Sequence, residues 1–237
     1  MELKPWYPRD FGHVLSNTLS EEEVTIGLNR PGCSPRFVYG ILMLPTILKY
    51  YIDMDPAVNI HKNMIQATLT GYKLHQFAES GTPVITPSSD PQATVKGVLI
   101  FGLNEHQRNS IYELEAGLMN LVNVQVEISQ KDTRNLRSRR VVEAGAFAWQ
   151  GPKEGLTPMG TTTWPVDEFL AGPFYENIVH AQQRASMGGS AESESTSRVV
   201  RLSQRQGSMS SSPSRRFESS LDSIKEEIEV MNIHDDI

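Results

Sequence analysis

The chain of 237 residues has one cysteine, Cys33, and no long uninterrupted apolar run. A single cysteine can form neither an internal disulfide nor a cysteine-based zinc cluster, which fits a reducing compartment. No stretch approaches the roughly 20 apolar residues that cross a bilayer, and residues 1–5 lack the apolar core of a signal peptide. The sequence therefore predicts a soluble intracellular protein without a membrane partner, cytoplasmic but with the nucleus left open.

Positive charge is in the minority, because 22 Lys and Arg stand against 28 Asp and Glu and give a formal net charge of -6. The chain as a whole is therefore not biased toward phosphates, and no nucleic-acid partner is predicted. The six histidines lack the i,i+3 or i,i+4 spacing of a metal site, and no G-x-S-x-G motif surrounds a serine. Gly71, Gly97 and Gly102 are isolated, so nucleotide-binding motifs are missing too. No metal and no cofactor are expected.

Composition divides the chain into three parts. Residues 1–35 hold few periodic apolar residues and are interrupted by proline and glycine, which predicts an irregular N-terminal arm. Residues 36–181 alternate apolar runs with turn residues, as a compact mixed domain does. Residues 182–237 are rich in serine and arginine and lose the large apolar side chains. Such a composition cannot offset the entropy of ordering, so a disordered tail is predicted.

The predicted tail carries two features that bear on function. Its apolar residues near the end recur at helical spacing: Leu221, Ile224, Ile228 and Met231. With Ser220 placed as a cap, one interpretation is a short amphipathic helix that folds on a protein partner, and the other is a solvated, fraying end. Arg205 lies three residues before Ser208, and Ser212 precedes Pro213, spacings that basic-directed and proline-directed kinases accept. Phosphorylation there would offset the arginine charge.

The middle part is predicted to be α+β. Strands are expected over residues 37–39, 67–77, 84–85, 95–101, 121–128 and 141–149, and helices over 45–51, 104–115 and 164–179. Gly71 predicts a bulge within the second strand, and Asn104 is a good helix cap. Residues 131–140 are polar and basic enough to be a hairpin connection. Gly172 and Pro173 are expected to split the last helix.

Two groups of residues are candidates for a functional site. Tyr39, Gly40, Ile41 and Leu42 follow a predicted strand, and a glycine turn there can direct several backbone N–H groups toward a carboxylate or an oxyanion. A tight turn without a ligand is the alternative. Glu115 ends a predicted helix, where it is either an acid or base or a solvated surface charge. The residues alone leave both questions open.

The order of the segments resembles the γ-glutamylcyclotransferase-like superfamily, especially its plant and fungal pathogen-induced-protein-like branch. The segments that carry the resemblance are FVYGIL at 37–42, ATLTGYKL at 67–74, TPVI at 82–85, VKGV at 95–98, LEA at 114–116 and VQV at 124–126. The similarity runs over residues 37–179 and leaves both termini uncovered. It implies a small mixed domain with a bent, mostly antiparallel sheet or barrel, flanking helices and a cavity at one end.

The resemblance also implies a reaction. The family's Y-G-x-L loop falls on Tyr39, Gly40, Ile41 and Leu42, whose backbone would hold a γ-glutamyl group, and its acid/base glutamate falls on Glu115. A small γ-glutamyl amine or peptide would be converted to 5-oxoproline and the free amine, with no cofactor. The substrate's own α-amino group would attack, Glu115 would move the proton, and the loop amides would stabilise the oxyanion. Burial is expected to raise the pKa of Glu115 toward neutrality.

Several positions differ from the family pattern. Ile111 and Tyr112 stand where the family has Leu-Asp, Met119 and Leu121 stand where it has Tyr and Arg, and Ile41 replaces a threonine. A cation and two hydroxyl groups that would orient an anionic substrate are therefore missing. The second hypothesis is a catalytically silent binding or interaction module of the same fold, with a phosphorylated tail.

Overall fold

The computed structural model describes residues 1–132, 134 and 136–187. The chain forms two units, Met1–Tyr175 and Glu176–Ile237. The first unit contains both sheets, and the described residues of the second continue helix α6 (Pro173–Met187). Disorder was predicted from residue 182 onward, but residues 182–187 are helical in the structure. The predicted terminal helix and the candidate phosphorylation sites Ser208 and Ser212 lie outside the described residues.

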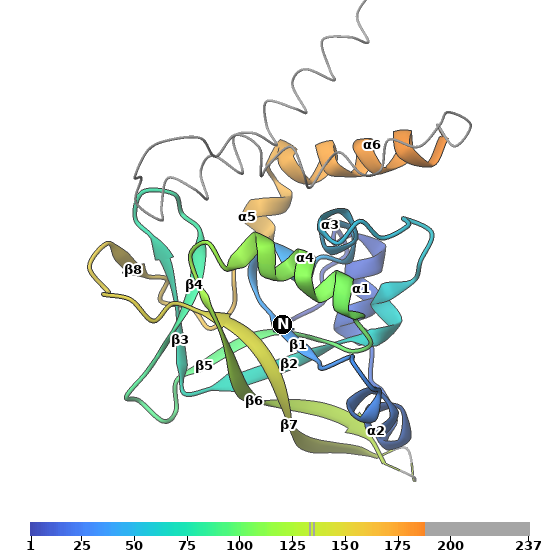
Figure 1. The fold of residues 1–237 in the computed structure, drawn as a ribbon, viewed down its shortest axis with the longest axis horizontal. Helices are drawn as coiled ribbons and strands as arrows, with labels where there is room; N and C mark the ends of the chain where they lie inside the picture. The colour runs from blue at the N-terminus through green and yellow to red at the C-terminus, as the bar shows by residue number, and fades with distance from the viewer. Residues whose placement is uncertain (133, 135, 188–237) are drawn as a thin grey trace, which may run out of the picture. The chain divides into compact units, whose positions relative to one another are not determined.

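Five strands close into a barrel in the order β1-β5-β2-β6-β7 (Figure 1). They are β1 (Arg36–Val38), β5 (Thr94–Ile100), β2 (Met64–Thr70), β6 (Asn120–Lys131) and β7 (Arg137–Ala148). Neighbouring strands are antiparallel, except that β1 meets β7 in parallel. Val124, Val126 and Ile128 on β6 are buried and alternate with more exposed residues, because one face of the wall meets the core. The predicted α+β fold with a small, mostly antiparallel barrel is confirmed.

A second sheet has three strands in the order β4-β3-β8. They are β4 (Pro83–Pro87), β3 (Tyr72–Phe77) and β8 (Leu156–Pro158), and β8 was not predicted. The prediction of one bulged strand over 67–77 was wrong, because Gly71 has φ 81° and separates β2 from β3, which belong to different sheets. The edge segment predicted at 84–85 is confirmed within β4.

The helices of the first unit are short. They are α1 (Arg9–Ser16), α2 (Glu21–Asn29), the 3-10 helix η1 (Gly40–Met43), α3 (Pro45–Tyr51), the 3-10 helix η2 (Ile60–Asn63), α4 (Glu105–Glu115) and α5 (Val166–Leu170). The predicted helix over 45–51 has the bounds of α3. Asn104 caps α4, with Gln107 completing a reciprocal capping box. The split predicted at Gly172 and Pro173 falls between α5 and α6, and is confirmed.

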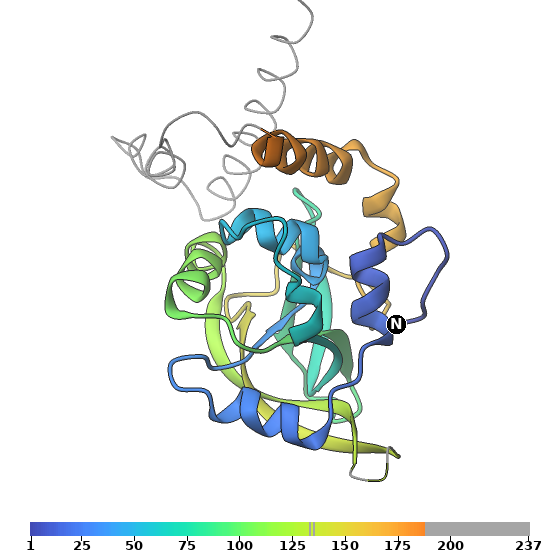
Figure 2. The same cartoon turned by 90° about the vertical axis from the view of Figure 1, so that its right-hand side faces the viewer.

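The amino-terminal segment is helical, whereas an irregular arm was predicted over residues 1–35. Phe11 and Val14 of α1 are fully buried, and Val24 of α2 is buried as well. Ser20 and Glu23 form a capping box at the start of α2. The backbone N–H of Lys131 donates to Leu19 O at 2.8 Å, which fastens this segment to the end of β6 (Figure 2). The helices escaped prediction because each buries at most three side chains.

Strands β6 and β7 form a long hairpin, paired from Asn120 with Ala148 to Lys131 with Arg137. The connection predicted over 131–140 is therefore too long, because the pairing leaves only residues 132–136 between the strands. The basic residues lie on exposed strand positions instead, as Arg139 does, whose guanidinium lies 3.2 Å from the carboxylate of Glu127. An exposed strand face tolerates the same polar composition as a loop.

Candidate active site

The tyrosine-glycine turn lies where β1 ends and η1 begins. Gly40 has φ 69°, in the left-handed region that favours glycine. A Cβ atom on Gly40 would also lie 3.0 Å from the Pro83 Cγ, so a larger residue would crowd β4. Leu42 is buried in the core, and Ile41 is partly exposed. Glycine therefore allows the chain to reverse direction here while staying packed against the second sheet.

The Tyr39 side chain ties three segments together. Its hydroxyl donates to the Phe147 carbonyl at 2.8 Å and accepts from the Ile85 backbone N–H at 3.3 Å. The Met119 sulfur lies 3.0 Å from the same hydroxyl. Burial, then the charge on Glu115, raise the pKa of Tyr39 well above its ordinary range, although the Ile85 N–H acts in the opposite direction. The hydroxyl is thus neutral and already engaged, so Tyr39 acts on this site as a structural anchor.

Glu115 is the last residue of α4, and its side chain is partly buried. Its backbone carbonyl accepts from the N–H groups of Leu118 at 3.1 Å and Met119 at 2.9 Å, which turn the chain toward β6. Removal from water raises the pKa of the Glu115 carboxyl from 4.5 to about 7, and no described cation forms an ion pair with it. A carboxyl with this pKa can both accept and return a proton near neutral pH.

Tyr51, which was not predicted as a site residue, ends α3. Its hydroxyl oxygen is buried and has no hydrogen-bond partner among the described residues. Burial, the neighbouring Tyr50 and the charge on Glu115 all raise the pKa of Tyr51, so the phenol keeps its proton. Most buried hydroxyl groups are paired, so an unpaired donor beside a desolvated carboxyl indicates a place where a polar ligand atom would bind.

The structure brings some predicted residues together and separates others. The charge on Glu115 raises the pKa of both Tyr39 and Tyr51, so the carboxyl lies within electrostatic reach of the two phenols. Met119 links this site to Tyr39 through its sulfur. Tyr112 and Leu121 are instead 49% and 40% exposed. No motif distinguishes Tyr51 in the sequence, and the adjacent Tyr50 in the same helix looks no different.

Among the described residues, two histidines lie close together, but they do not form part of a metal site. His13 Nδ1 and His61 Nε2 lie 3.4 Å apart, joining α1 to η2. Among residues 1–132, 134 and 136–187, no three His, Cys, Asp or Glu side chains converge where they could hold a metal ion. Within the same residues, no helix combines the length and apolarity needed to cross a bilayer.

The structure combines a small closed barrel, a glycine turn after β1 and a glutamate at the end of α4, as the resemblance to the γ-glutamylcyclotransferase-like superfamily implies. The family model described as gamma-glutamyl cyclotransferase, AIG2-like matches residues 36–166. The match covers more than half of the chain, and the chain belongs to this family.

Several solved structures are similar to this chain at low sequence identity. A solution structure from Arabidopsis thaliana is 18% identical, with a TM-score of 0.43 over 77% of this chain and 96% of its own. An uncharacterized protein from Homo sapiens is 15% identical, with a TM-score of 0.38 over 81% and 99%. A structure titled gamma-glutamyl cyclotransferase is also 15% identical, with a TM-score of 0.38 over 79% and 99%. A search of curated proteins found no match.

Proposed function

We propose that the protein converts a γ-glutamyl amine or peptide to 5-oxoproline and the free amine, with Glu115 as general acid and base. The observation that carries the proposal is the partly buried carboxyl at the end of α4, whose pKa is raised to about 7 beside Tyr39 and Tyr51. Membership of the family supports the reaction type. The proposal needs no protein nucleophile, because the substrate supplies its own.

The reaction joins the substrate's α-nitrogen to its side-chain carbonyl carbon and breaks the bond from that carbon to the amide nitrogen. Two protons leave the α-ammonium group, and two arrive on the departing amine. Glu115 accepts protons from the first nitrogen and returns them to the second, which a carboxyl with a pKa near neutrality does at little energetic cost. Ring closure within one molecule also gains from orientation, since a folded substrate holds its reacting atoms together.

Two kinds of donor in this site suit the substrate's oxygens. The first backbone N–H groups of a helix have no partner inside it, so those at the start of η1, from Gly40 to Leu42, suit the oxyanion of the tetrahedral intermediate. The unpaired hydroxyl of Tyr51 suits a carboxylate or carbonyl oxygen of the γ-glutamyl group. Met119 stands where the family has a tyrosine. Under this proposal, the hydroxyl of Tyr51 takes the place of that missing hydroxyl.

The test incubates the purified chain with a panel of γ-glutamyl amines and γ-glutamyl dipeptides and measures 5-oxoproline by mass. We expect at least one substrate to be turned over by the natural chain and by Glu113→Gln, an exposed control on the same helix. We expect Glu115→Gln to keep its fold and lose turnover. Turnover by Glu115→Gln near the natural rate would eliminate the assignment of this carboxyl.

A binding module without catalysis is the second candidate. The observation that favours it is the loss of the family's tyrosine and arginine at Met119 and Leu121, because Leu121 offers no cation to an anionic substrate. If this candidate is right, the folded protein forms no 5-oxoproline from any member of the panel. It nevertheless binds a γ-glutamyl compound saturably, as measured by calorimetry.

A further inference from the structure

Three arginines near the start of α4 have no acidic partner among the described residues. Arg36 begins β1, Arg108 lies one turn inside α4, and Arg30 follows α2. None of the three forms an ion pair with any Asp or Glu in the described part of the chain. The one hydrogen bond found for their side chains within that part joins Arg36 Nη1 to the Pro35 carbonyl, at a long 3.4 Å.

Two of these side chains carry buried donors that no described residue satisfies. The Nε atoms of Arg36 and Arg108 are both buried and both lack a hydrogen-bond partner among the described residues. Burial, together with the charge of Arg108, lowers the pKa of Arg36. Two neighbouring cations with unpaired buried N–H groups are unfavourable in an empty site, because repulsion and lost hydration add together. A bound anion would remove both penalties.

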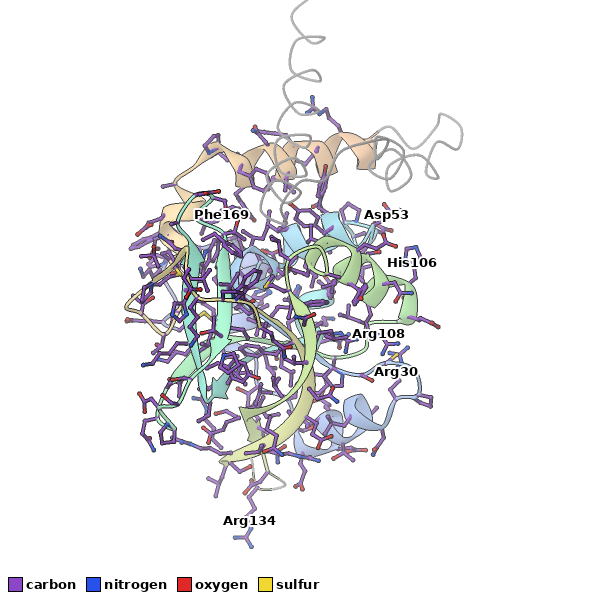
Figure 3. All side chains as sticks on the ribbon, turned by 60° about the vertical axis from the view of Figure 1, so that its left-hand side comes forward. Arg30, Asp53, His106, Arg108, Arg134 and Phe169 are labelled. Carbon is purple, nitrogen blue, oxygen red and sulfur yellow. The ribbon has the colours of Figure 1, made fainter. Side chains whose placement is uncertain are left out.

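Glycines make room for the guanidinium groups. A Cβ atom on Gly145 would lie 2.7 Å from Arg36 Nη1. Because glycine has no side chain, the Arg36 guanidinium can pack against β7. A Cβ atom on Gly102 would lie 3.3 Å from Arg30 Nη1, which places Arg30 over the connection from β5 to α4. The last residue of β5, Ile100, pairs with Arg36. Arg36 and Arg30 therefore lie at the same end of β5, and Figure 3 shows Arg108 on the same side of the unit as Arg30.

This cluster is separate from the Glu115 site. Glu115 lies seven residues beyond Arg108 on α4, roughly 10 Å along the helix axis at about 1.5 Å per residue. The fully buried Ile111 stands between them on the helix. A ligand held by the arginines is therefore not the group that Glu115 would protonate.

We infer that Arg36 and Arg108, with Arg30 at the rim, form a binding site for a phosphate-type dianion. Guanidinium groups match tetrahedral oxyanions because their N–H donors form paired hydrogen bonds to neighbouring oxygens. Two unpaired cations favour a doubly charged ligand over a monocarboxylate. The site holds either free phosphate or the phosphate of a phosphomonoester, since both present the same oxygens.

The experiment measures thermal unfolding of the full chain at pH 7.5 in chloride, acetate, phosphate and glycerol phosphate at matched ionic strength. The variants are Arg36→Gln, Arg108→Gln and, as a matched control, Arg134→Gln. Arg134 is exposed near the tip of the β6–β7 hairpin, far from Arg30 and Arg108 in Figure 3. The control accounts for general effects of phosphate on protein stability.

For the natural chain and Arg134→Gln, we expect a saturable rise in melting temperature of about 3–6 °C at ten times the dissociation constant of the phosphate ligand. We expect Arg108→Gln to lose this rise and, in chloride, to melt no lower than the natural chain, because the substitution removes a repulsion. If Arg36→Gln does not fold, Arg108→Gln decides alone. A phosphate response equal to that of chloride or acetate, or one retained in Arg108→Gln, would overturn the inference. A larger response to glycerol phosphate than to inorganic phosphate would identify a phosphomonoester as the ligand.

Discussion

Replacing Glu115 by glutamine should raise stability in a way that depends on pH. Burial raises the pKa of the Glu115 carboxyl from 4.5 to about 7, so between these pH values the folded chain binds more protons than the unfolded chain. The free energy of unfolding of the natural chain therefore falls as pH rises through this window, and a glutamine does not titrate. The shift corresponds to a stabilisation of about 3 kcal/mol in Glu115→Gln at pH 8, but less than about 1 kcal/mol at pH 5.

Urea unfolding followed by tryptophan fluorescence at pH 5 and pH 8 measures this difference directly. For a chain of this size, the value at pH 8 corresponds to about 6–12 °C in melting temperature. The informative quantity is the change in the gap between variant and natural chain from pH 5 to pH 8, because hydrogen bonds made by the glutamine itself affect both pH values equally. Glu113→Gln, on the same helix but exposed, should show no such change.

The same substitution should lower the turnover rate about 10²–10⁴-fold if the loss of proton transfer is its only effect. Greater stability with less activity is the signature of a carboxyl held in a desolvated site for chemistry rather than for folding. An identical stability gap at pH 5 and pH 8 would refute the claim that the Glu115 carboxyl is desolvated. In that case the physical basis for its role as acid and base is lost.

The remaining predictions concern the two phenols and the pH profile. Tyr51→Phe should leave the free energy of unfolding unchanged or raise it, because the substitution removes a buried hydroxyl without a described partner. The same substitution should raise KM about tenfold. A loss of stability with an unchanged KM would instead make Tyr51 a structural residue. Tyr39→Phe should lower the free energy of unfolding in urea by about 1–3 kcal/mol, because the Phe147 carbonyl and the Ile85 N–H lose their hydrogen-bond partner. An unchanged midpoint of urea unfolding would contradict this prediction. Because the ionised Glu115 accepts the proton, kcat/KM should fall below a pH of about 7, and a profile flat from pH 5 to pH 8 would exclude that role.

Local signals in the sequence predicted the elements that frame the candidate site. Pro45 is favoured at the first position of a helix, and Asn104 is a good helix cap, so α3 and α4 begin where expected. Glu115 was expected at the end of α4 because Ile111 and Leu114 continue the helical spacing to that point. These signals depend on neighbours within a few residues, which makes them readable without a fold.

Elements that depend on distant partners were predicted poorly. Gly71 was interpreted as a bulge because the residues on both sides have strand character, yet β2 and β3 pair with different strands. The exposed basic residues of β7 resembled a loop because their polarity reflects contact with solvent and not the backbone conformation. Helix α1 escaped notice although Phe11 and Val14 are fully buried, since a short helix is stabilised by tertiary packing rather than by its own propensity.

The sequence by itself determined the α+β class, the starts of the main helices and the two segments, Tyr39 to Leu42 and Glu115, that resemble the family's motifs. Only the tertiary structure closed the barrel, placed Tyr51 within reach of the Glu115 charge and gathered Arg36 and Arg108 without an acidic partner among the described residues. Capping and hydrophobic periodicity act over a few residues, whereas desolvation and unpaired donors arise only when distant segments pack together and exclude water.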